Sequence, residues 1–255
     1  MRAILSIARR ELDAYFATPM GWLVLCGFVA VTGLFFTLML VGYAMQSTQM
    51  AMNPYGGQQM NINEYLLPDF FGNTSVILLF LCPALTMRLF AEDRGRRSFE
   101  LLMSSPVSST EIVLGKYLGA LGYLGVLLAS TLHYVAILYW LGSPDAGVLV
   151  ASYGALFLLS AAFMAVGMLM SSFTVNQIVA FVLSFGVLLG LWVLAWMDAF
   201  ASESWVKVIT YVSLLSHQSD LAKGLVHLKD LVYFTSFIGF FLFATQQRVE
   251  AYRWQ

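Results

Sequence analysis

Six long runs of apolar residues constrain the fold of this chain more than any other feature of its sequence. A helix needs about 20 apolar residues to cross the hydrocarbon core of a bilayer. The runs predict spans at 20–45, 73–90, 115–141, 147–171, 177–197 and 231–247. Hydrophobic residues make up 60% of the 255 residues and charged residues only 11%. Soluble domains have fewer hydrophobic residues and about 25% charged residues. We therefore expect an all-α, polytopic membrane protein with a single transmembrane domain over residues 1–255.

Composition and charge exclude several other classes of protein. A net charge of −1 does not suit a nucleic-acid-binding protein, so no nucleic-acid partner is expected. Cys26 and Cys82 both lie inside apolar runs, which is neither a disulfide framework nor a zinc site. The membrane cores of the spans hold no Asp, Glu, Lys or Arg, whereas ion-coupled carriers place ionisable residues there. His133 is the titratable residue in these cores, and we interpret it as a hydrogen-bonded packing residue.

The sequence also lacks the patterns of a catalyst. Gly115-Lys116 is followed by Tyr117 and lacks the upstream glycine of a phosphate-binding loop. No arrangement of His, Cys, Asp and Glu suits a metal or an intramembrane protease. We therefore expect no catalytic residue, metal or cofactor in this chain. Any uphill transport must then draw its energy from a partner at a cytoplasmic surface.

The distribution of Lys and Arg predicts the orientation of the spans, because cytoplasmic loops carry an excess of these residues. With the N-terminus inside, ten of the 13 basic residues lie on the cytoplasmic side, and only Lys207, Lys223 and Lys229 lie outside. An even number of spans places both termini on one side. We therefore predict cytoplasmic termini and outer loops at 46–72, 142–147 and 198–230.

Residues 1–19 have the pattern of an amphipathic helix. Their apolar side chains fall on one arc at about 100° per residue, and most of their charged side chains fall on the other. Thr18-Pro19 predicts the end of this helix. The pattern favours an interfacial helix in the cytoplasmic headgroup region. The alternative is a generic anchor with no mechanical role.

The stretch 91–114 is the most informative part of the sequence. It opens with a cluster of charged residues, namely Glu92, Asp93, Arg94, Arg96 and Arg97. An apolar face at helical spacing follows, made by Phe99, Leu102 and Met103, with Glu100 pointing elsewhere. Such a face suits a groove on a partner protein, whereas the charges around it fix the register.

Two further signals complete a helix–turn–helix in this stretch. Pro106 ends the first helix, and Ser108 with Glu111 predicts a capping box that starts the next one. The element is directly linked to the second and third spans, so it can carry force between a partner and those spans. The alternative is an ordinary cytoplasmic loop whose basic residues only fix the orientation.

Two more features concern packing. The stretch 198–230 is neither polar enough for a loop nor apolar enough to span twice, which predicts two short amphipathic helices entering the outer leaflet. A surface loop packed on the bundle is the alternative. Glycines line faces of the third and fifth spans: Gly115, Gly119, Gly122 and Gly125, and then Gly186 and Gly190. These faces suit close packing within the chain or against a second copy.

Three motifs, found in order along nearly the whole chain, carry a resemblance to a known family. They are Ala8–Pro19, Glu92–Lys116, and Leu215–Gly224 followed by Asp230–Tyr233. The chain resembles the membrane subunit, or permease, of type 2 ABC transporters. It is most similar to the compact six-span branch that includes the gliding-motility and nitrous-oxide-reductase maturation permeases. Met103 stands where a leucine is commoner in such motifs.

The resemblance implies six transmembrane helices with an N-terminal interfacial helix, a cytoplasmic coupling helix and an outer re-entrant helix pair. It implies that the coupling helix docks in a groove of a separate ATPase. The coupling residues would be Glu92, Asp93, Arg94, Arg96, Arg97, Phe99, Glu100, Leu102, Met103 and Pro106. The interfacial helix would contribute Arg9, Arg10, Glu11 and Pro19, and the outer segment His217, Asp220, Lys223 and Gly224.

The resemblance also implies partners and a location. Two ABC-type ATPase subunits, which hold ATP and Mg, would bind a dimer of this permease or of two related permeases in the bacterial cytoplasmic (inner) membrane. The expected function is a non-catalytic, multi-pass subunit of an exporter whose substrate does not follow from the sequence. One alternative is a membrane scaffold whose ATPase partner drives mechanical or assembly work without cargo. Another is a membrane-embedded enzyme, which the absence of a mid-membrane polar constellation disfavours.

Overall fold

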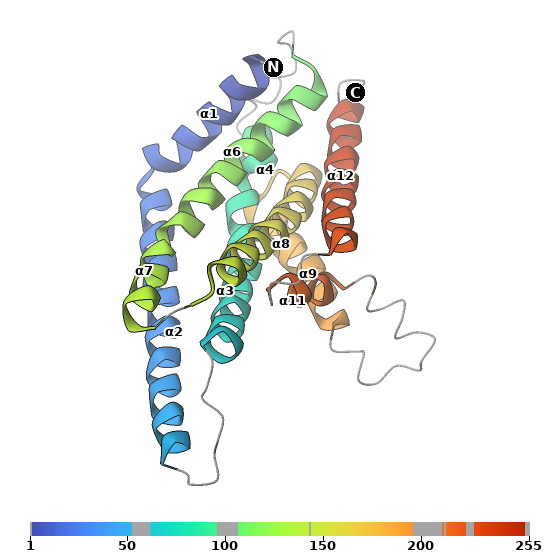
Figure 1. The fold of residues 1–255 in the computed structure, drawn as a ribbon. Coiled ribbons are helices and arrows are strands. Elements are labelled where there is room, and N and C mark those ends of the chain that lie inside the picture. The colour runs from blue at the N-terminus through green and yellow to red at the C-terminus, as the bar shows by residue number, and fades with distance from the viewer. Residues whose placement is uncertain are drawn as a thin grey trace.

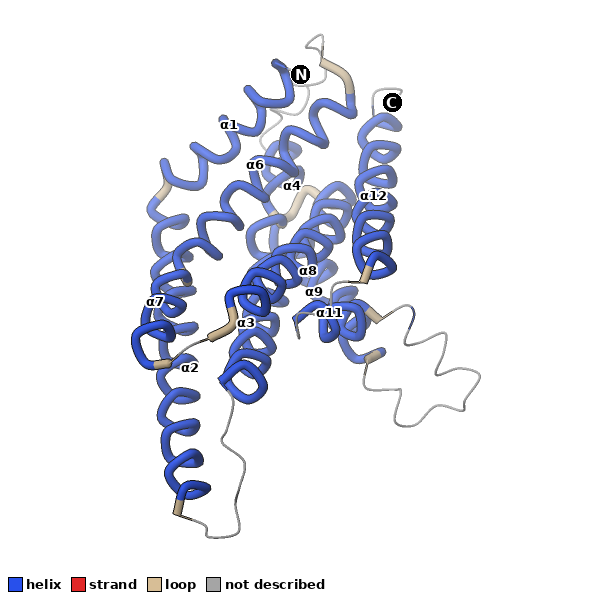
Figure 2. Tube along the Cα trace, viewed as in Figure 1, coloured by secondary structure: helices blue, strands red, loops and turns tan. Residues whose placement is uncertain are grey.

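The computed structural model describes residues 2–52, 62–95, 107–142, 144–195, 211, 213–222 and 227–252. Within these ranges the elements are all helices, as Figures 1 and 2 show. In chain order they are α1 (Arg2–Ala17), α2 (Pro19–Ala51), α3 (Ile62–Thr86), α4 (Arg88–Gly95), α6 (Ser109–Ser130), α7 (Leu132–Leu141), α8 (Ala146–Phe173), α9 (Gln177–Leu194), α11 (Leu214–Ala222) and α12 (Leu228–Ala251). The predicted all-α fold class is confirmed.

Six stretches of the described chain are long and apolar enough to cross a membrane. They are Pro19–Met50, Tyr65–Gly95, Ser109–Leu141, Ala146–Phe173, Gln177–Leu194 and Leu228–Ala251. Their number is the one that the sequence predicts. The two chain ends lie at the same end of the molecule, as an even number of spans requires (Figure 1).

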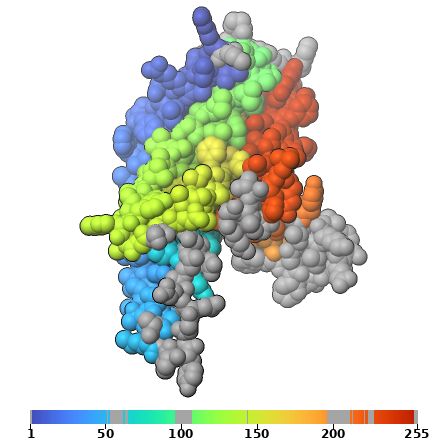
Figure 3. Space-filling view, viewed as in Figure 1, coloured from blue at the N-terminus to red at the C-terminus, as the bar shows by residue number. Residues whose placement is uncertain are grey.

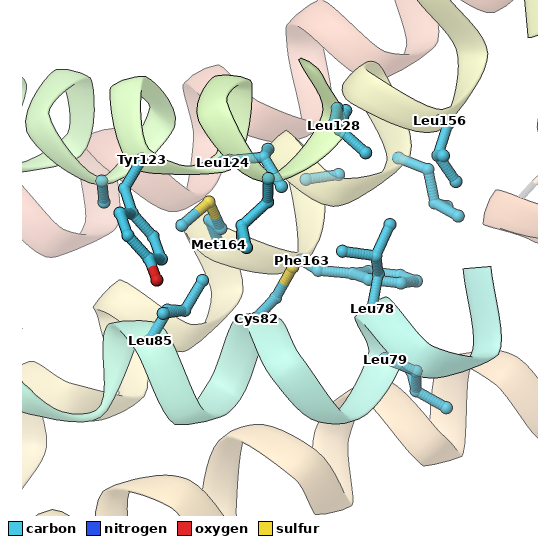
Figure 4. Packing of buried hydrophobic residues seen from close by; sticks show 14 of the residues in the cluster. Leu78, Leu79, Cys82, Leu85, Tyr123, Leu124, Leu128, Leu156, Phe163 and Met164 are labelled. Carbon is cyan, nitrogen blue, oxygen red and sulfur yellow. The ribbon is translucent and has the colours of Figure 1, made fainter. Parts of the chain in front are cut away.

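Helix α8 forms the centre of the bundle. Every residue from Leu159 to Leu169 is buried, so this part of α8 is enclosed on all sides. Alanines at 161, 162 and 165 keep its surface narrow and let neighbouring helices approach closely. Figure 4 shows Cys82 of α3, Leu124 of α6 and Phe163 of α8 directed toward one another in this core.

Helix α2 is the longest of the described helices, and most of its side chains are not buried. Its 33 residues extend about 50 Å at 1.5 Å per residue, which exceeds a hydrocarbon core of about 30 Å. It must therefore tilt or project beyond the bilayer. In the space-filling view its distal half extends past the rest of the bundle (Figure 3). The predicted outer loop at 46–72 is accordingly shorter, because α2 continues to Ala51 and α3 begins at Ile62.

The third span is interrupted at Thr131, between α6 and α7. The Thr131 hydroxyl donates a hydrogen bond to the Leu128 carbonyl at 2.7 Å and lies 2.9 Å from the Tyr153 hydroxyl of α8. His133 lies just beyond this break and is exposed. Its Nδ1 lies 2.5 Å from the Ser130 carbonyl oxygen, so the predicted hydrogen bond is confirmed, whereas the predicted packing in the core is wrong, because the side chain is exposed.

Candidate functional site

Lys116, near the start of α6, is the centre of an ionic cluster that joins three helices. Its side chain is only 1% exposed. Its Nζ lies 2.8 Å from Oε1 of Glu11 on α1 and 2.7 Å from Oδ2 of Asp93 on α4. A buried ammonium persists only when it is paired, and two carboxylates supply that pairing here. One side chain thus links the N-terminal helix, the extension of the second span and the start of the third.

Glu11 remains ionised in this cluster. Burial alone raises the pKa of its carboxyl group, but the charges and hydrogen bonds of Lys116 and Arg10 outweigh burial and leave the pKa below its usual value. Arg10 donates a hydrogen bond from Nη2 to the same Oε1 atom at 2.9 Å. The contact between α1 and α6 is therefore a charged one at neutral pH.

The glycine face of α6 brings α1 close enough for this pairing. A Cβ atom at Gly115 would lie 2.7 Å from Cβ of Ile7, and one at Gly119 would lie 2.6 Å from Cβ of Glu11. No side chain larger than hydrogen fits there without a shift of α1. Of the two alternatives that the sequence leaves open for this face, packing within the chain is the one observed. By contrast, a Cβ at Gly125, Gly186 or Gly190 would meet no described atom within 4 Å.

Helix α4 is tied to α8 at the break that follows α3. The Ser171 hydroxyl accepts hydrogen bonds from the backbone N–H groups of Phe90 and Ala91, each at 3.1 Å, and donates to the Met87 carbonyl at 2.8 Å. The first N–H groups of a helix have no partner within it, so Ser171 caps α4 from another helix. Arg94 donates from Nη1 to the Ser172 carbonyl at 2.8 Å, which satisfies a carbonyl at the end of α8.

Three of the residues predicted for coupling lie on α4, namely Glu92, Asp93 and Arg94. Asp93 is itself a member of the Lys116 cluster. The others, Arg96, Arg97, Phe99, Glu100, Leu102, Met103 and Pro106, lie outside the described residues. The predicted capping box at Ser108 is confirmed. The Ser108 hydroxyl accepts from the Glu111 N–H at 3.2 Å, and the Ser108 N–H donates to Oε2 of Glu111 at 3.1 Å.

The residues predicted for the N-terminal helix occupy different environments. Arg9 is exposed and lies 3.8 Å from Asp13, whereas Glu11 belongs to the Lys116 cluster. The predicted stop is confirmed, since α1 ends at Ala17 and Pro19 is the first residue of α2. The turn between them is tight, because a Cβ at Gly21 would lie only 1.9 Å from the Tyr15 carbonyl oxygen. The interfacial placement of α1 stays a prediction.

A second polar cluster surrounds α11, at the opposite end of the bundle. His217 lies with Nδ1 2.6 Å from Oδ1 of the fully buried Asp230, and its ring stacks on Tyr233 at 4.1 Å between centroids. Gln218 donates from Nε2 to the Ser75 hydroxyl of α3 at 2.6 Å. These contacts fix α11 against α12 and α3. The side chain of Asp220, together with Lys223 and Gly224, lies outside the described residues, and the re-entrant pair stays a prediction.

Sequence reasoning missed the partners rather than the residues. The Gly115-Lys116 dipeptide predicts no phosphate-binding loop, whereas the position of Lys116 on a glycine-lined helix face is a signal for a buried contact. Asp230 belongs to the Asp230–Tyr233 motif, but nothing in the sequence pairs it with His217. Ser171 carries no signal of its capping role in the sequence. In the described ranges, no three His, Cys, Asp or Glu residues form a group that could hold a metal ion.

Comparisons with known proteins place this architecture in a family. A model of the family described as "ABC-2 family transporter protein" matches residues 5–244. A comparison with curated proteins finds no match. The family match extends from α1 into α12, so it includes five of the six apolar stretches in full and most of the sixth. The chain therefore belongs to the ABC-2 family of transporter proteins, as a membrane permease subunit of an ABC transporter.

Proposed function

We propose that this permease is driven by a separate ABC-type ATPase through the stretch 91–114, and that it works as an exporter. The observation that carries the proposal is the Lys116 cluster. It joins α4 and α6, the two helices that flank the stretch, and it joins both to α1. A displacement of the stretch would therefore reach both flanking spans together rather than be absorbed in a loop.

The connection to the core of the bundle supports this route. Ser171 and Arg94 attach α4 to the C-terminal end of α8, whose residues from Leu159 to Leu169 are all buried. Packed helices move as rigid bodies, so a displacement of α4 should displace α8 as well. In this proposal the apolar face of Phe99, Leu102 and Met103 docks in a groove of the ATPase. ATP and Mg then belong to the ATPase, and this chain contributes no catalytic group.

The assembly proposed is two permeases with two ATPases in the bacterial cytoplasmic membrane, with both termini in the cytoplasm. The distribution of Lys and Arg supports that orientation. The permease could pair with a second copy or with a related chain. Exposed apolar residues such as Val182 and Val187 on α9 leave room for such a contact.

The first experiment tests docking. Phe99→Ala combined with Glu100→Arg should abolish co-purification of the ATPase without reducing the amount of permease in the membrane. Burying a phenylalanine contributes about 1.5–3 kcal/mol, so its loss weakens docking by about tenfold or more. Phe240→Ala is the matched control, because Phe240 is exposed on α12. Retention of the ATPase by the double variant would show that the stretch is only an orienting loop.

The second experiment separates docking from transmission. Lys116→Gln removes the link among three helices but leaves the proposed docking face intact. We expect the ATPase to remain bound, while its hydrolysis rate in the complex falls toward that of the isolated ATPase. An unchanged rate would contradict transmission through Lys116. Hydrolysis that stays coupled while no cargo crosses in reconstituted vesicles would instead favour the scaffold.

A further inference from the structure

A cavity of about 300 Å³ opens where the α1–α2 turn, the α3–α4 break and the start of α9 meet. Its polar lining comes from Arg88, Glu92 and Gln177, and most of the remaining lining is apolar, including Val24 and Leu85. The volume falls at the lower end of the range for small-molecule sites, about 300–1,000 Å³.

The lining changes character along the direction of the spans. Helix α2 runs away from the chain ends and α3 runs toward them (Figure 1), so Val24 lies deeper along its span than Met20, and Leu85 lies deeper than Arg88 and Glu92. The polar lining therefore lies nearer the chain ends, and the apolar lining extends farther along the spans. A membrane lipid has the same order, with a charged headgroup above its acyl chains.

The guanidinium group of Arg88 is fixed in position by an aromatic ring. Its guanidinium carbon lies 3.8 Å from the centre of the Tyr15 ring, and the Tyr15 hydroxyl is fixed by donating to the Leu85 carbonyl at 2.9 Å. Among the described residues, no carboxylate forms an ion pair with Arg88. Its neighbours Arg94 and Lys116, in contrast, are both bound to oxygen atoms of the chain. A planar guanidinium matches the oxygens of a phosphate better than an ammonium does.

Glu92 limits which phosphate-bearing headgroup fits. It lies one helical turn after Arg88 and lines the same cavity. A headgroup with only negative charge would face both an attraction and a repulsion. A headgroup that joins a phosphodiester to an ammonium group offers an opposite charge to each side chain.

We propose that this cavity binds one phospholipid with an amine-bearing headgroup. Its phosphodiester lies on Arg88, its ammonium group faces Glu92, and an acyl chain runs along Val24 and Leu85. The proposal concerns the permease alone and does not depend on coupling to an ATPase.

Native mass spectrometry of the delipidated, purified permease tests the proposal, with short-chain phosphatidylethanolamine as the probe. We expect one lipid per permease to bind in preference to all others. Arg88→Gln should weaken that binding by about tenfold or more, because a charge-assisted contact is lost. Arg2→Gln is the matched control, since it removes the same charge from an exposed position outside the cavity.

Two other variants keep the test decisive if Arg88→Gln does not fold. Ala84→Phe fills the cavity while Arg88 remains, and it should also abolish the bound lipid. Glu92→Gln should remove the preference for phosphatidylethanolamine over phosphatidylglycerol. Equal binding by the wild type, Arg88→Gln and Ala84→Phe would overturn the site. Displacement of the lipid by inorganic phosphate would show an anion site rather than a lipid site, and tighter binding of phosphatidylglycerol would overturn the headgroup.

Discussion

The buried ammonium group of Lys116 is stabilised by its ion pairs with Glu11 and Asp93. Replacing Lys116 with methionine removes the cation that Glu11 and Asp93 share, although Arg10 still pairs with Glu11. Removing one member of a buried ion pair costs about 3–5 kcal/mol, so we expect Lys116→Met to lower the unfolding temperature in detergent markedly. Arg2→Met, which removes a charge from an exposed position on α1, should have little effect.

A combined variant distinguishes lost charge balance from poor packing of the methionine. Glu11→Gln and Asp93→Asn added to Lys116→Met remove the two carboxylates that the first change exposes. They should therefore recover part of the lost stability. No recovery would mean that the cluster is not held by its charges.

Glu11 should make the stability of the permease depend on pH in one direction. Its pKa in the folded chain lies below the usual 4.5, because Lys116 and Arg10 outweigh the effect of burial. The stability that this carboxylate contributes is complete above pH 4.5 and is lost as the pH falls through the lowered pKa. Between pH 7 and pH 3, the unfolding temperature of the wild type should fall steeply below pH 4.5. The unfolding temperature of Glu11→Gln should fall less steeply over the same range. Parallel profiles for the two proteins would contradict this assignment.

The approach of α3 to α8 is set by a single glycine. A Cβ atom at Gly167 would lie 2.0 Å from Oγ1 of the fully buried Thr86 and 3.0 Å from its Cβ, so Gly167→Ala forces the helices apart or turns Thr86 from its hydrogen bond. Overpacking of this kind costs about 1–3 kcal/mol. We expect a lower unfolding temperature for Gly167→Ala but not for Gly154→Ala, where a Cβ meets no described atom within 4 Å. Equal behaviour of the two variants would contradict the close approach.

The bounds of several helices could be predicted from the sequence, because their signals are local. The contacts between helices could not be predicted. Apolar length predicts the six spans, Thr18-Pro19 predicts the end of α1, and Ser108 with Glu111 predicts the start of α6. The central position of α8 depends on contacts between distant residues, and nothing in its own apolar run distinguishes it from α2. The pairing of Lys116 with Glu11 and Asp93 could not be predicted for the same reason, because Glu11 lies 105 residues away in the sequence. The predicted coupling residues from Arg96 to Pro106 lie outside the described chain, so their roles stay predictions.

The molecule as a whole presents two unlike ends. The end with both termini holds α1, α4 and the Lys116 cluster, and the opposite end holds α11 with its His217–Asp230 pair. If the proposed coupling is correct, the first end meets the ATPase and the second faces the exterior. The orientation of the chain in the membrane is therefore the property on which every proposed contact with the ATPase depends.

Labelling of single cysteines tests that orientation. Cys26 and Cys82 are first replaced by serine and alanine, because Cys26 is exposed in the structure and could react by itself. A cysteine at Gly57, between α2 and α3, should react with an impermeant maleimide added to intact cells, whereas one at Arg97, between α4 and α6, should react only after the cells are opened. Ten of 13 basic residues lie on the side of Arg97 in this arrangement, and reversing the chain would place that excess outside. The opposite labelling pattern would place α4 and the Lys116 cluster on the exterior, where no ATPase could reach them.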